Sequence, residues 1–275
     1  MYLKKRRGMV ISITTLIIMV ASVVLGTGFI SYVFSMFVFA VNNPPQLTIA
    51  TPTTQSVTFV FLVRTGSPES NLIPIYQKHV TSTSIVAQFA NNLLDANVTS
   101  KIVSQKATTF FSYADIQGNA TNLHNLGYGW VIYDLEGSYS PPNEMLDPVG
   151  SVQQASQAAH NNGLKLMLSP AGISPAYYAN MSKYTDGWVM QAMNLIAGDP
   201  TTMSNTVHNY VSKIKSGNSN EIIILQDSVN LDTLDQMNNA WDLTKDVVNG
   251  ITVFYSDPSQ LPIMDSAYAH VDGNN

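Results

Sequence analysis

The sequence contains no cysteine. This absence excludes disulfide bonds, thiolate nucleophiles and cysteine-ligated metal sites. It does not argue against a location outside the cytoplasm, because an oxidising compartment permits disulfides without requiring them. Residues 58–275 are numerous enough to fold around one core without such cross-links.

Charge is missing from a long stretch near the N-terminus. No Asp, Glu, Lys or Arg occurs at residues 8–63, whereas residues 4–7 are Lys-Lys-Arg-Arg. Residues 9–30 are apolar apart from Ser, Thr and Gly, and a membrane-spanning helix needs about 20 mostly apolar residues. Because basic flanks stay on the cytoplasmic side, we expect residues 1–8 in the cytoplasm. We expect a single-pass helix with its extension at 9–41, and a C-terminal domain outside the cytoplasm.

Basic residues are scarce in the remainder of the chain. Nine basic and eighteen acidic residues follow residue 63, which gives this part a net charge of −9. Nucleic-acid binding depends on basic patches that face phosphates. The negative net charge therefore argues against a nucleic-acid partner. It suits a soluble domain that contacts neutral polymers.

Three fates are open for the apolar segment. A cleaved secretory signal is disfavoured because its apolar region spans only about 7–15 residues, and a retained signal anchor is the plain alternative. The third possibility comes from Lys-Lys-Arg-Arg-Gly followed by an apolar helix punctuated by Ser and Thr. This segment resembles the N-terminus of archaeal pilins and archaellins, which implies cleavage after Gly8 and a helix that packs in a filament or stays in the membrane.

Residues 42–57 are rich in Pro and Thr and predict an extended linker. Three Asn-x-Ser/Thr sequons follow it, at Asn97, Asn119 and Asn180. Each lies at the end of an expected element, where surface exposure suits a glycosylation acceptor.

Short apolar runs alternate with helical periods from residue 58 onward. Strands are expected at 58–63, 101–105, 129–136, 164–169, 187–193, 221–228 and 251–256, and helical periodicity is clearest at 85–94 and 203–214. This alternation predicts a parallel sheet in an α/β protein, and a TIM-like (β/α) barrel at 58–275 fits it best. The eighth strand is not evident; residues 267–271 are the candidate, so an incomplete or irregular barrel and a doubly wound open sheet both stay open.

Side chains alternate between the two faces of a strand. At 129–136 this parity places Asp134 and Glu136 on one face, pointing into the barrel at its C-terminal mouth, where barrel enzymes build their sites. The same parity gives other strands an inward polar residue near that end: Ser169, Gln191, Gln226 and Ser256. We expect these four to form a polar, substrate-binding pocket.

The carboxylate pair suggests acid catalysis. Two carboxylates on one strand face repel, which tends to raise the pKa of one of them. A Glu with a raised pKa can donate a proton near neutral pH, as the departure of a sugar oxygen requires, so we expect the raised pKa on Glu136. The structural alternative is a pair that caps loop amides at the barrel rim.

Tyr133-Asp134-Leu135-Glu136, followed by Leu-Met-Leu-Ser-Pro at 166–170, is similar to barrel glycosidases of the chitinase type. The resemblance implies that Glu136 is the general acid and that Asp134 assists the acetamido group of the substrate. It places Gln191 where those enzymes have polar sugar contacts. Residues 130–170 also resemble uncharacterised bacterial and archaeal barrel proteins, which supports the fold.

Three functions remain open for the chain. The first is a membrane-anchored, cell-surface glycoside hydrolase, and the second is a non-catalytic barrel that binds a glycan or a protein. The third is a pilin-like structural subunit. No cofactor is expected, and the five histidines lack metal-ligand spacing; four lie in or beside expected helices and are predicted at the surface.

Overall fold

The computed structural model describes residues 57–63, 72–88, 93–94 and 99–273. The expected cytoplasmic segment, the membrane helix and most of the linker lie outside these residues. Among the helices that are described, none is both long and apolar enough to cross a membrane.

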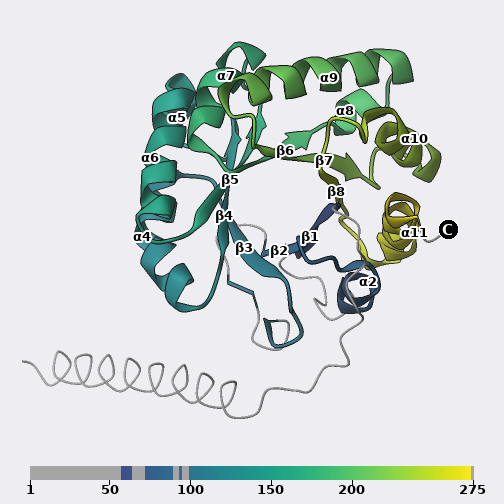
Figure 1. Ribbon diagram of the computed structural model, residues 1–275, viewed down its shortest axis with the longest axis horizontal. Helices are drawn as coiled ribbons and strands as arrows, with labels where there is room; N and C mark the ends of the chain where they lie inside the picture. Colours follow the sequence, from purple (N-terminus) through teal and green to yellow (C-terminus); the bar gives the residue numbers. More distant parts are fainter. Residues whose placement is uncertain (1–56, 64–71, 89–92, 95–98, 274–275) are drawn as a thin grey trace, which may run out of the picture. The chain divides into compact units, whose positions relative to one another are not determined.

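Eight parallel strands form a closed barrel in chain order, and β8 pairs with β1 (Figure 1). The prediction of a TIM-like barrel is confirmed. The strands are β1 (Thr58–Val63), β2 (Ile85–Gln88), β3 (Gln105–Phe110), β4 (Trp130–Glu136), β5 (Lys165–Ala171), β6 (Gly187–Gln191), β7 (Ile222–Ser228) and β8 (Gly250–Phe254).

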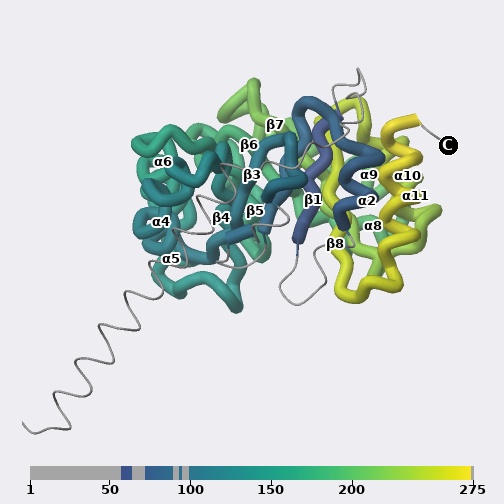
Figure 2. The backbone as a smooth tube through the Cα atoms, turned by 90° about the horizontal axis from the view of Figure 1, so that it is seen from below, coloured from purple at the N-terminus to yellow at the C-terminus, as the bar shows by residue number. Residues whose placement is uncertain are grey.

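Helices surround the barrel. They are α2 (Leu72–His79), α4 (Tyr113–Asn125), α5 (Pro142–Leu146), α6 (Pro148–His160), α7 (Tyr178–Met181), α8 (Met193–Ile196), α9 (Pro200–Gly217), α10 (Leu234–Thr244) and α11 (Leu261–Asp272). Helices α4 and α6 lie across the strands from α10 and α11 in both views (Figures 1 and 2). Among the described residues, the outward faces of β4 to β8 pack under helices, which leaves the ends of the strands as the place for a ligand.

Two hydrophobic cores follow from the alternation of side chains along the strands. The larger core lies between strands and helices and includes Trp188 and Tyr133. The smaller one fills the barrel interior with side chains from seven strands: Val60, Ile85, Ala87, Ala107, Trp130, Ile132, Met167, Val189 and Ile224. This inner core closes the barrel from below, so a ligand can enter only part of the way from the C-terminal mouth.

The structure corrects three expectations about the elements. Residues 85–88, expected to begin a helix, form β2 between β1 and β3 and complete the ring. The strand expected at 101–105 begins where that range ends, as β3 at 105–110. Residues 267–271, the candidate eighth strand, lie within α11.

The ring closes at a very tight contact between β8 and β1. Gly250 pairs with Thr58, and a Cβ atom added to Gly250 would lie 1.7 Å from the carbonyl oxygen of Thr58. Both partners of this contact are backbone, which cannot move aside as a flexible side chain can. Only glycine permits this approach.

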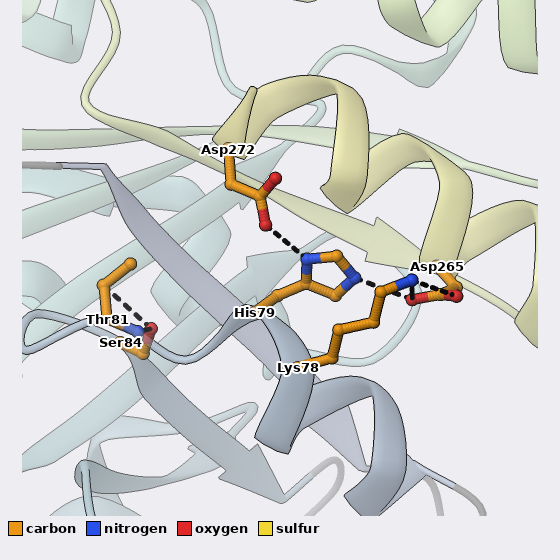
Figure 3. Close-up of polar contacts among 6 residues, drawn as sticks. All are labelled: Lys78, His79, Thr81, Ser84, Asp265 and Asp272. Carbon is orange, nitrogen blue, oxygen red and sulfur yellow. Dashed lines mark hydrogen bonds and ion pairs between the residues drawn. The ribbon is translucent and has the colours of Figure 1, made fainter. Parts of the chain in front are cut away.

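A buried histidine ties helix α2 to helix α11 (Figure 3). His79 at the end of α2 lies with Nδ1 2.5 Å from Asp272 Oδ2 and with Nε2 2.7 Å from Asp265 Oδ1, and both aspartates belong to α11. Lys78 Nζ donates to the same Asp265 carboxylate at 2.9 Å. His79 is 2% exposed, which corrects the expectation of surface histidines at this position, and it reinforces the β8–β1 seam.

Candidate functional site

The C-terminal ends of the strands enclose a cavity of about 260 Å³. All of its lining residues except Tyr139 and Met193 lie on barrel strands. The lining consists of Val60, Leu62, Thr109, Ile132, Asp134, Glu136, Tyr139, Ser169, Val189, Gln191, Met193, Gln226, Thr252 and Phe254. The cavity is therefore the upper part of the barrel interior, and the inner core forms its floor.

Asp134 lies on the wall of this cavity and is 6% exposed. Its strand neighbour in register is Ser169 on β5. Gln191 reaches over from β6, and its Nε2 donates to Asp134 Oδ1 at 3.3 Å and to Ser169 Oγ at 3.1 Å. The three side chains thus form one polar group across three consecutive strands.

Burial, and then the negative charge of Glu136, raise the pKa of Asp134 from 3.8 to about 7, against a lowering contribution from a hydrogen bond with Ser169. Desolvation penalises the charged form of a carboxyl group, and a second carboxylate nearby adds to that penalty. Asp134 is therefore a carboxyl group that both takes up and releases a proton near neutral pH.

Glu136 is the last residue of β4 and is half-buried at the rim. A tight turn follows it, in which Ser140 Oγ accepts from Glu136 N at 3.0 Å and donates to Asp134 O at 3.1 Å. The serine holds the backbone of both acidic residues, and it leaves their carboxyl groups to the cavity. Among the described residues, no side chain or backbone group donates a hydrogen bond to the Glu136 carboxylate.

The structure brings five of the six residues predicted from strand parity into this cavity: Asp134, Glu136, Ser169, Gln191 and Gln226. Ser256 is not among them, because β8 ends two residues earlier and Phe254 takes the place at the rim. The Ser256 hydroxyl is exposed and donates to Asn230 Oδ1 at 2.6 Å.

The predicted modification sites lie away from the cavity or outside the described residues. Asn119 is exposed on α4, but in the middle of the helix rather than at an element end. Asn180 is exposed on α7, and its Oδ1 accepts from Lys183 Nζ at 2.8 Å. Gly8 and Asn97 lie outside the described residues.

Sequence reasoning missed two buried hydroxyl groups in the cavity lining. Thr109 on β3 and Thr252 on β8 each carry a hydroxyl oxygen with no hydrogen-bond partner among the described residues. Both threonines point into the barrel, as Asp134 does. The alternation of side chains along the strand expected at 251–256 already predicts this orientation for Thr252. Thr109 was missed because β3 was expected too early in the chain.

The aromatic pair of Tyr139 and Phe111 at the rim was also missed. Tyr139, in the turn after β4, is 64% exposed and stacks on Phe111, with ring centroids 5.3 Å apart and an interplanar angle of 27°. Phe254 lines the cavity from the end of β8. Loop residues such as Tyr139 carry no periodic signal, so parity could not place them.

The cavity has two chemically different sides. Its polar side comes from β4, β5 and β6, with Asp134, Ser169 and Gln191. Across the ring, β8 and β1 contribute the apolar side chains of Phe254 and Leu62, together with the single hydroxyl group of Thr252. This arrangement suits a ligand with hydroxyl or amide groups on one edge and an apolar face on the other. In the part of the chain that the structure describes, no three His, Asp or Glu residues are grouped to hold a metal ion.

Comparisons with known proteins identify the fold only. No protein-family model matches this chain, and no curated protein matches its sequence. The Bacillus megaterium spore cortex-lytic enzyme SleL is similar in structure, with a TM-score of 0.50, 12% identity and coverage of 78% of this chain and 75% of SleL. A GH128 endo-β-1,3-glucanase from Amycolatopsis mediterranei, in complex with laminaripentaose, gives a TM-score of 0.52 at 8% identity and covers 78% of this chain and 99% of the glucanase.

An enzyme of different chemistry is equally similar in structure. The tryptophan synthase α-subunit of Pyrococcus furiosus gives a TM-score of 0.52 at 10% identity, over 80% of this chain and 98% of the subunit. The shared (β/α) barrel therefore does not by itself select an activity, since one fold hosts many functions.

Proposed function

We propose that this chain is a glycoside-hydrolase-like barrel that acts on a glycan, with Glu136 as the proton donor and Asp134 as its assisting partner. The observation that carries the proposal is the placement of both carboxyl groups in one cavity at the C-terminal mouth of the barrel. Barrel enzymes assemble their sites at that end.

The two carboxyl groups occupy different depths, which suits different roles. Glu136 lies at the half-exposed rim. There it can reach the glycosidic oxygen, which departs with the outer part of the glycan. Asp134 lies deeper, and its pKa near 7 allows it to hold or release a proton as charge develops on the sugar. In chitinase-type enzymes, which this strand resembles, the corresponding aspartate assists the acetamido group of the substrate.

The rest of the cavity supports a sugar ligand. Phe254 and Leu62 offer an apolar surface for a pyranose face, while Gln226 and the two threonine hydroxyls offer hydrogen bonds to hydroxyl groups. The stacked pair of Tyr139 and Phe111 adds an exposed aromatic surface at the rim. Two of the similar structures, the cortex-lytic enzyme and the β-1,3-glucanase, add weak support for a polysaccharide partner.

Hydrolysis by the Glu136→Gln variant tests the catalytic role. Gln keeps the size of Glu but cannot donate its proton, so we expect a loss of about 100-fold or more in the rate, as is usual for a missing general acid. The matched control is Asp246→Asn, which removes an exposed carboxyl group that does not line the cavity and should leave hydrolysis at the wild-type rate. A panel of β-1,3-, β-1,4- and N-acetylated glycans that wild-type protein leaves uncut would refute the enzymatic proposal.

A non-catalytic glycan-binding barrel is the second candidate, and one observation favours it. The full chitinase-type signature, D-x-x-D-x-D-x-E, requires aspartate at two positions that are Gly129 and Ile132 here. Ile132 is buried in the inner core, where it supplies no proton relay to Asp134. This candidate predicts that glycan binding, measured by calorimetry, survives Glu136→Gln and that no bond is cut by either protein.

The location of the barrel is a further part of the proposal. The uncharged segment at 9–41, behind its four basic residues, supports a membrane anchor that holds the domain outside the cytoplasm. Protease added to intact cells should then release the domain. N-terminal sequencing separates the remaining fates, because a chain that starts at residue 9 supports the pilin-like route and recovery in sheared filaments would support a structural subunit.

A further inference from the structure

The two glutamines in the described cavity lining differ in their partners. Gln191 Nε2 donates to Asp134 Oδ1 at 3.3 Å and to Ser169 Oγ at 3.1 Å, so the protein itself uses this amide. Gln226 is 8% exposed, and its Nε2 contacts Met193 Sδ at 3.9 Å, although a thioether sulfur is a weak acceptor. Among the described residues, no group donates a hydrogen bond to Gln226 Oε1. The Gln226 amide is therefore the one that is left for a ligand.

A buried hydroxyl group lies beside this amide. Thr252 on β8 pairs in register with Gln226 on β7, and both side chains line the cavity. The Thr252 side chain is fully buried, and its Oγ1 has no hydrogen-bond partner among the described residues. An unsatisfied buried hydroxyl group is costly until a ligand or water completes it. Because β8 lies opposite β4 in the eight-strand ring, Gln226 and Thr252 form a polar edge across the cavity from the two acids.

This polar edge lies below the rim of the barrel. Thr252 precedes the rim residue Phe254 by two positions on β8, which is about 6.6 Å along the strand at about 3.3 Å per residue. Its register partner on β1 is Val60, which belongs to the inner core. A ligand that reaches Thr252 therefore enters the barrel and does not only cross its mouth.

The cavity has room for one sugar ring and not for a chain of them. Its volume of about 260 Å³ lies below the range of about 300–1,000 Å³ for pockets that enclose drug-sized ligands. The strands form a closed barrel around it, and the interior of an eight-stranded barrel holds one small ligand at most. An internal residue of a glycan carries linkages on two sides, whereas a terminal residue carries one. A ring inside this cavity can join a longer chain only through the mouth.

The proton donor assigned to the mouth, Glu136, places the reacting bond there. We propose, on the basis of the proposed function, that the cavity binds the terminal, non-reducing sugar of a neutral glycan. Gln226 and Thr252 recognise free hydroxyl groups on the edge of this ring that lies furthest from the reacting bond. A primary amide has donors at one end and an acceptor at the other, which matches two adjacent hydroxyl groups. The enclosed ring is released as a monosaccharide, so cleavage proceeds from the chain end.

Water is the co-reactant of this cleavage. The bond between the anomeric carbon of the enclosed ring and the glycosidic oxygen breaks. The electron pair leaves with the oxygen, which takes the proton of Glu136. Water then supplies a hydroxyl group to the anomeric carbon and returns a proton to the Glu136 carboxylate. The outer chain departs through the mouth one residue shorter.

The charge of the lining favours a neutral sugar. Asp134 and Glu136 line the cavity, and among its described lining residues there is no Lys, Arg or His. A uronate or sulfate group in the cavity would face two carboxyl groups with no cation beside it, and a buried charge without a partner is costly. A polyuronate should therefore remain uncut.

Product analysis with two blocked oligosaccharides tests the direction of cleavage. The full chain in detergent receives β-1,3- and β-1,4-linked oligomers of glucose and of N-acetylglucosamine. Oligomers whose reducing end is converted to an alditol should be cut at the untreated rate and should release a monosaccharide from the first time point. Oligomers methylated at O4 of the terminal, non-reducing ring should resist cleavage. Early release of mixed oligosaccharides, or equal cleavage of the methylated form, would overturn the proposal.

The variants Gln226→Met and Thr252→Val measure the recognition of the terminal ring. Each keeps the approximate size of the side chain and removes its hydrogen-bonding groups, so kcat/KM should fall by about 10-fold. Thr252→Val removes no internal hydrogen bond and should fold as stably as wild type. Neither variant should lose further rate on an oligomer whose terminal ring lacks the hydroxyl groups at C3 and C4, because the contact is already missing. Equal losses on both substrates would overturn the assignment.

The matched control is Thr244→Val. Thr244 is as buried as Thr252, but its Oγ1 donates to Ala240 O at 2.7 Å within α10, away from the cavity. The variant should keep the wild-type kcat/KM on both substrates. A loss in Thr244→Val as large as that in Thr252→Val would also contradict a specific contact of Thr252 with the sugar.

Free monosaccharides separate this inference from the proposed function. Calorimetric titration with glucose or N-acetylglucosamine needs no bond cleavage. Binding that Gln226→Met weakens, in a protein that cuts no glycan, supports the terminal-sugar site and refutes only the enzymatic role. Cleavage within chains by a protein that depends on Glu136 refutes only the terminal-sugar site. A protein that neither binds a monosaccharide nor cuts a glycan refutes both.

Discussion

Replacing Asp134 with Asn should change how the stability of the domain depends on pH. Because the folded pKa of about 7 exceeds the ordinary value of 3.8, the unfolded chain loses this proton first as pH rises. It then binds fewer protons than the folded state, and the free energy of unfolding falls until the folded Asp134 ionises near pH 7. The separation of the two values corresponds to on the order of 4 kcal/mol, since one pH unit is worth about 1.36 kcal/mol.

The assay is urea-induced unfolding of wild-type and Asp134→Asn protein from pH 4 to pH 8. Asn carries no titrating proton, so its free energy of unfolding lacks this dependence on pH. As pH rises from 4 to 8, Asp134→Asn should therefore become more stable relative to wild type by most of that amount. Other buried carboxyl groups, such as Glu221 with a pKa raised to about 8 by burial, affect both proteins equally and cancel.

The same substitution at an exposed aspartate provides the control. Asp199 caps α9 by accepting from Thr202 N at 2.8 Å, and hydrogen bonds to Thr202 lower its pKa. Its contribution to stability is present above its ordinary pKa of 3.8 and is lost below it, so the wild-type and Asp199→Asn curves should stay nearly parallel from pH 4 to pH 8. Parallel pH curves for wild-type and Asp134→Asn protein would refute the assignment of Asp134 as a buried carboxyl group that titrates near neutrality.

Three further substitutions test the scaffold, each by chemical unfolding. Gly250→Ala places a Cβ atom 1.7 Å from the Thr58 carbonyl oxygen and should cost about 3 kcal/mol or more by forcing β8 from β1; a cost below about 1 kcal/mol would show that the seam is loose. Gly118→Ala, in α4 with no atom within 4 Å of the new Cβ, should instead stabilise by about 0.5–1 kcal/mol; destabilisation would contradict the open space around it. His79→Leu removes the imidazole beside the buried Asp272 carboxylate and should cost about 3 kcal/mol of stability. An unchanged free energy of unfolding would contradict the idea that His79 holds α2 to α11.

The sequence predicted the long, regular elements well because their signals are local. Apolar residues at helical spacing predict a helix at 203–214, and α9 covers this range from its N-cap Asp199. Strand β1 was placed at its observed bounds, and β4, β5, β7 and β8 were placed to within two residues at each end. The inward parity of β4 and β5 was correct, so both carboxyl groups were found before the fold was known.

The short strand β2 escaped prediction because four residues carry too little pattern. Residues 85–94 satisfy a helical period, yet residues 85–88 pair with β1 and β3. Pairing with two neighbouring strands decides the conformation of such a run, and periodicity alone cannot show it. Without β2, residues 267–271 are the remaining candidate for an eighth strand, but their apolar residues belong to the buried face of α11.

The chemistry of the site was predicted in outline, and its contacts were not. Strand parity gathered Ser169 and Gln191 at the mouth, but their contact with Asp134 depends on how far a Gln side chain reaches across β5. The raised pKa was expected on the glutamate, as a consequence of repulsion between the two acids. Burial, the largest cause, raises it on Asp134 instead, and the depth of a residue in the barrel depends on side chains from neighbouring strands.

The role of Glu136 is tested most directly by varying the leaving group. A nitrophenolate departs without protonation, whereas an alkyl alcohol or a sugar needs a general acid. If Glu136 donates the proton, Glu136→Gln should lose about 100-fold or more in rate on alkyl glycosides or oligosaccharides and several-fold at most on nitrophenyl glycosides. An equal loss on both classes, or no loss on either, would contradict the assignment of Glu136 as the acid at the barrel mouth.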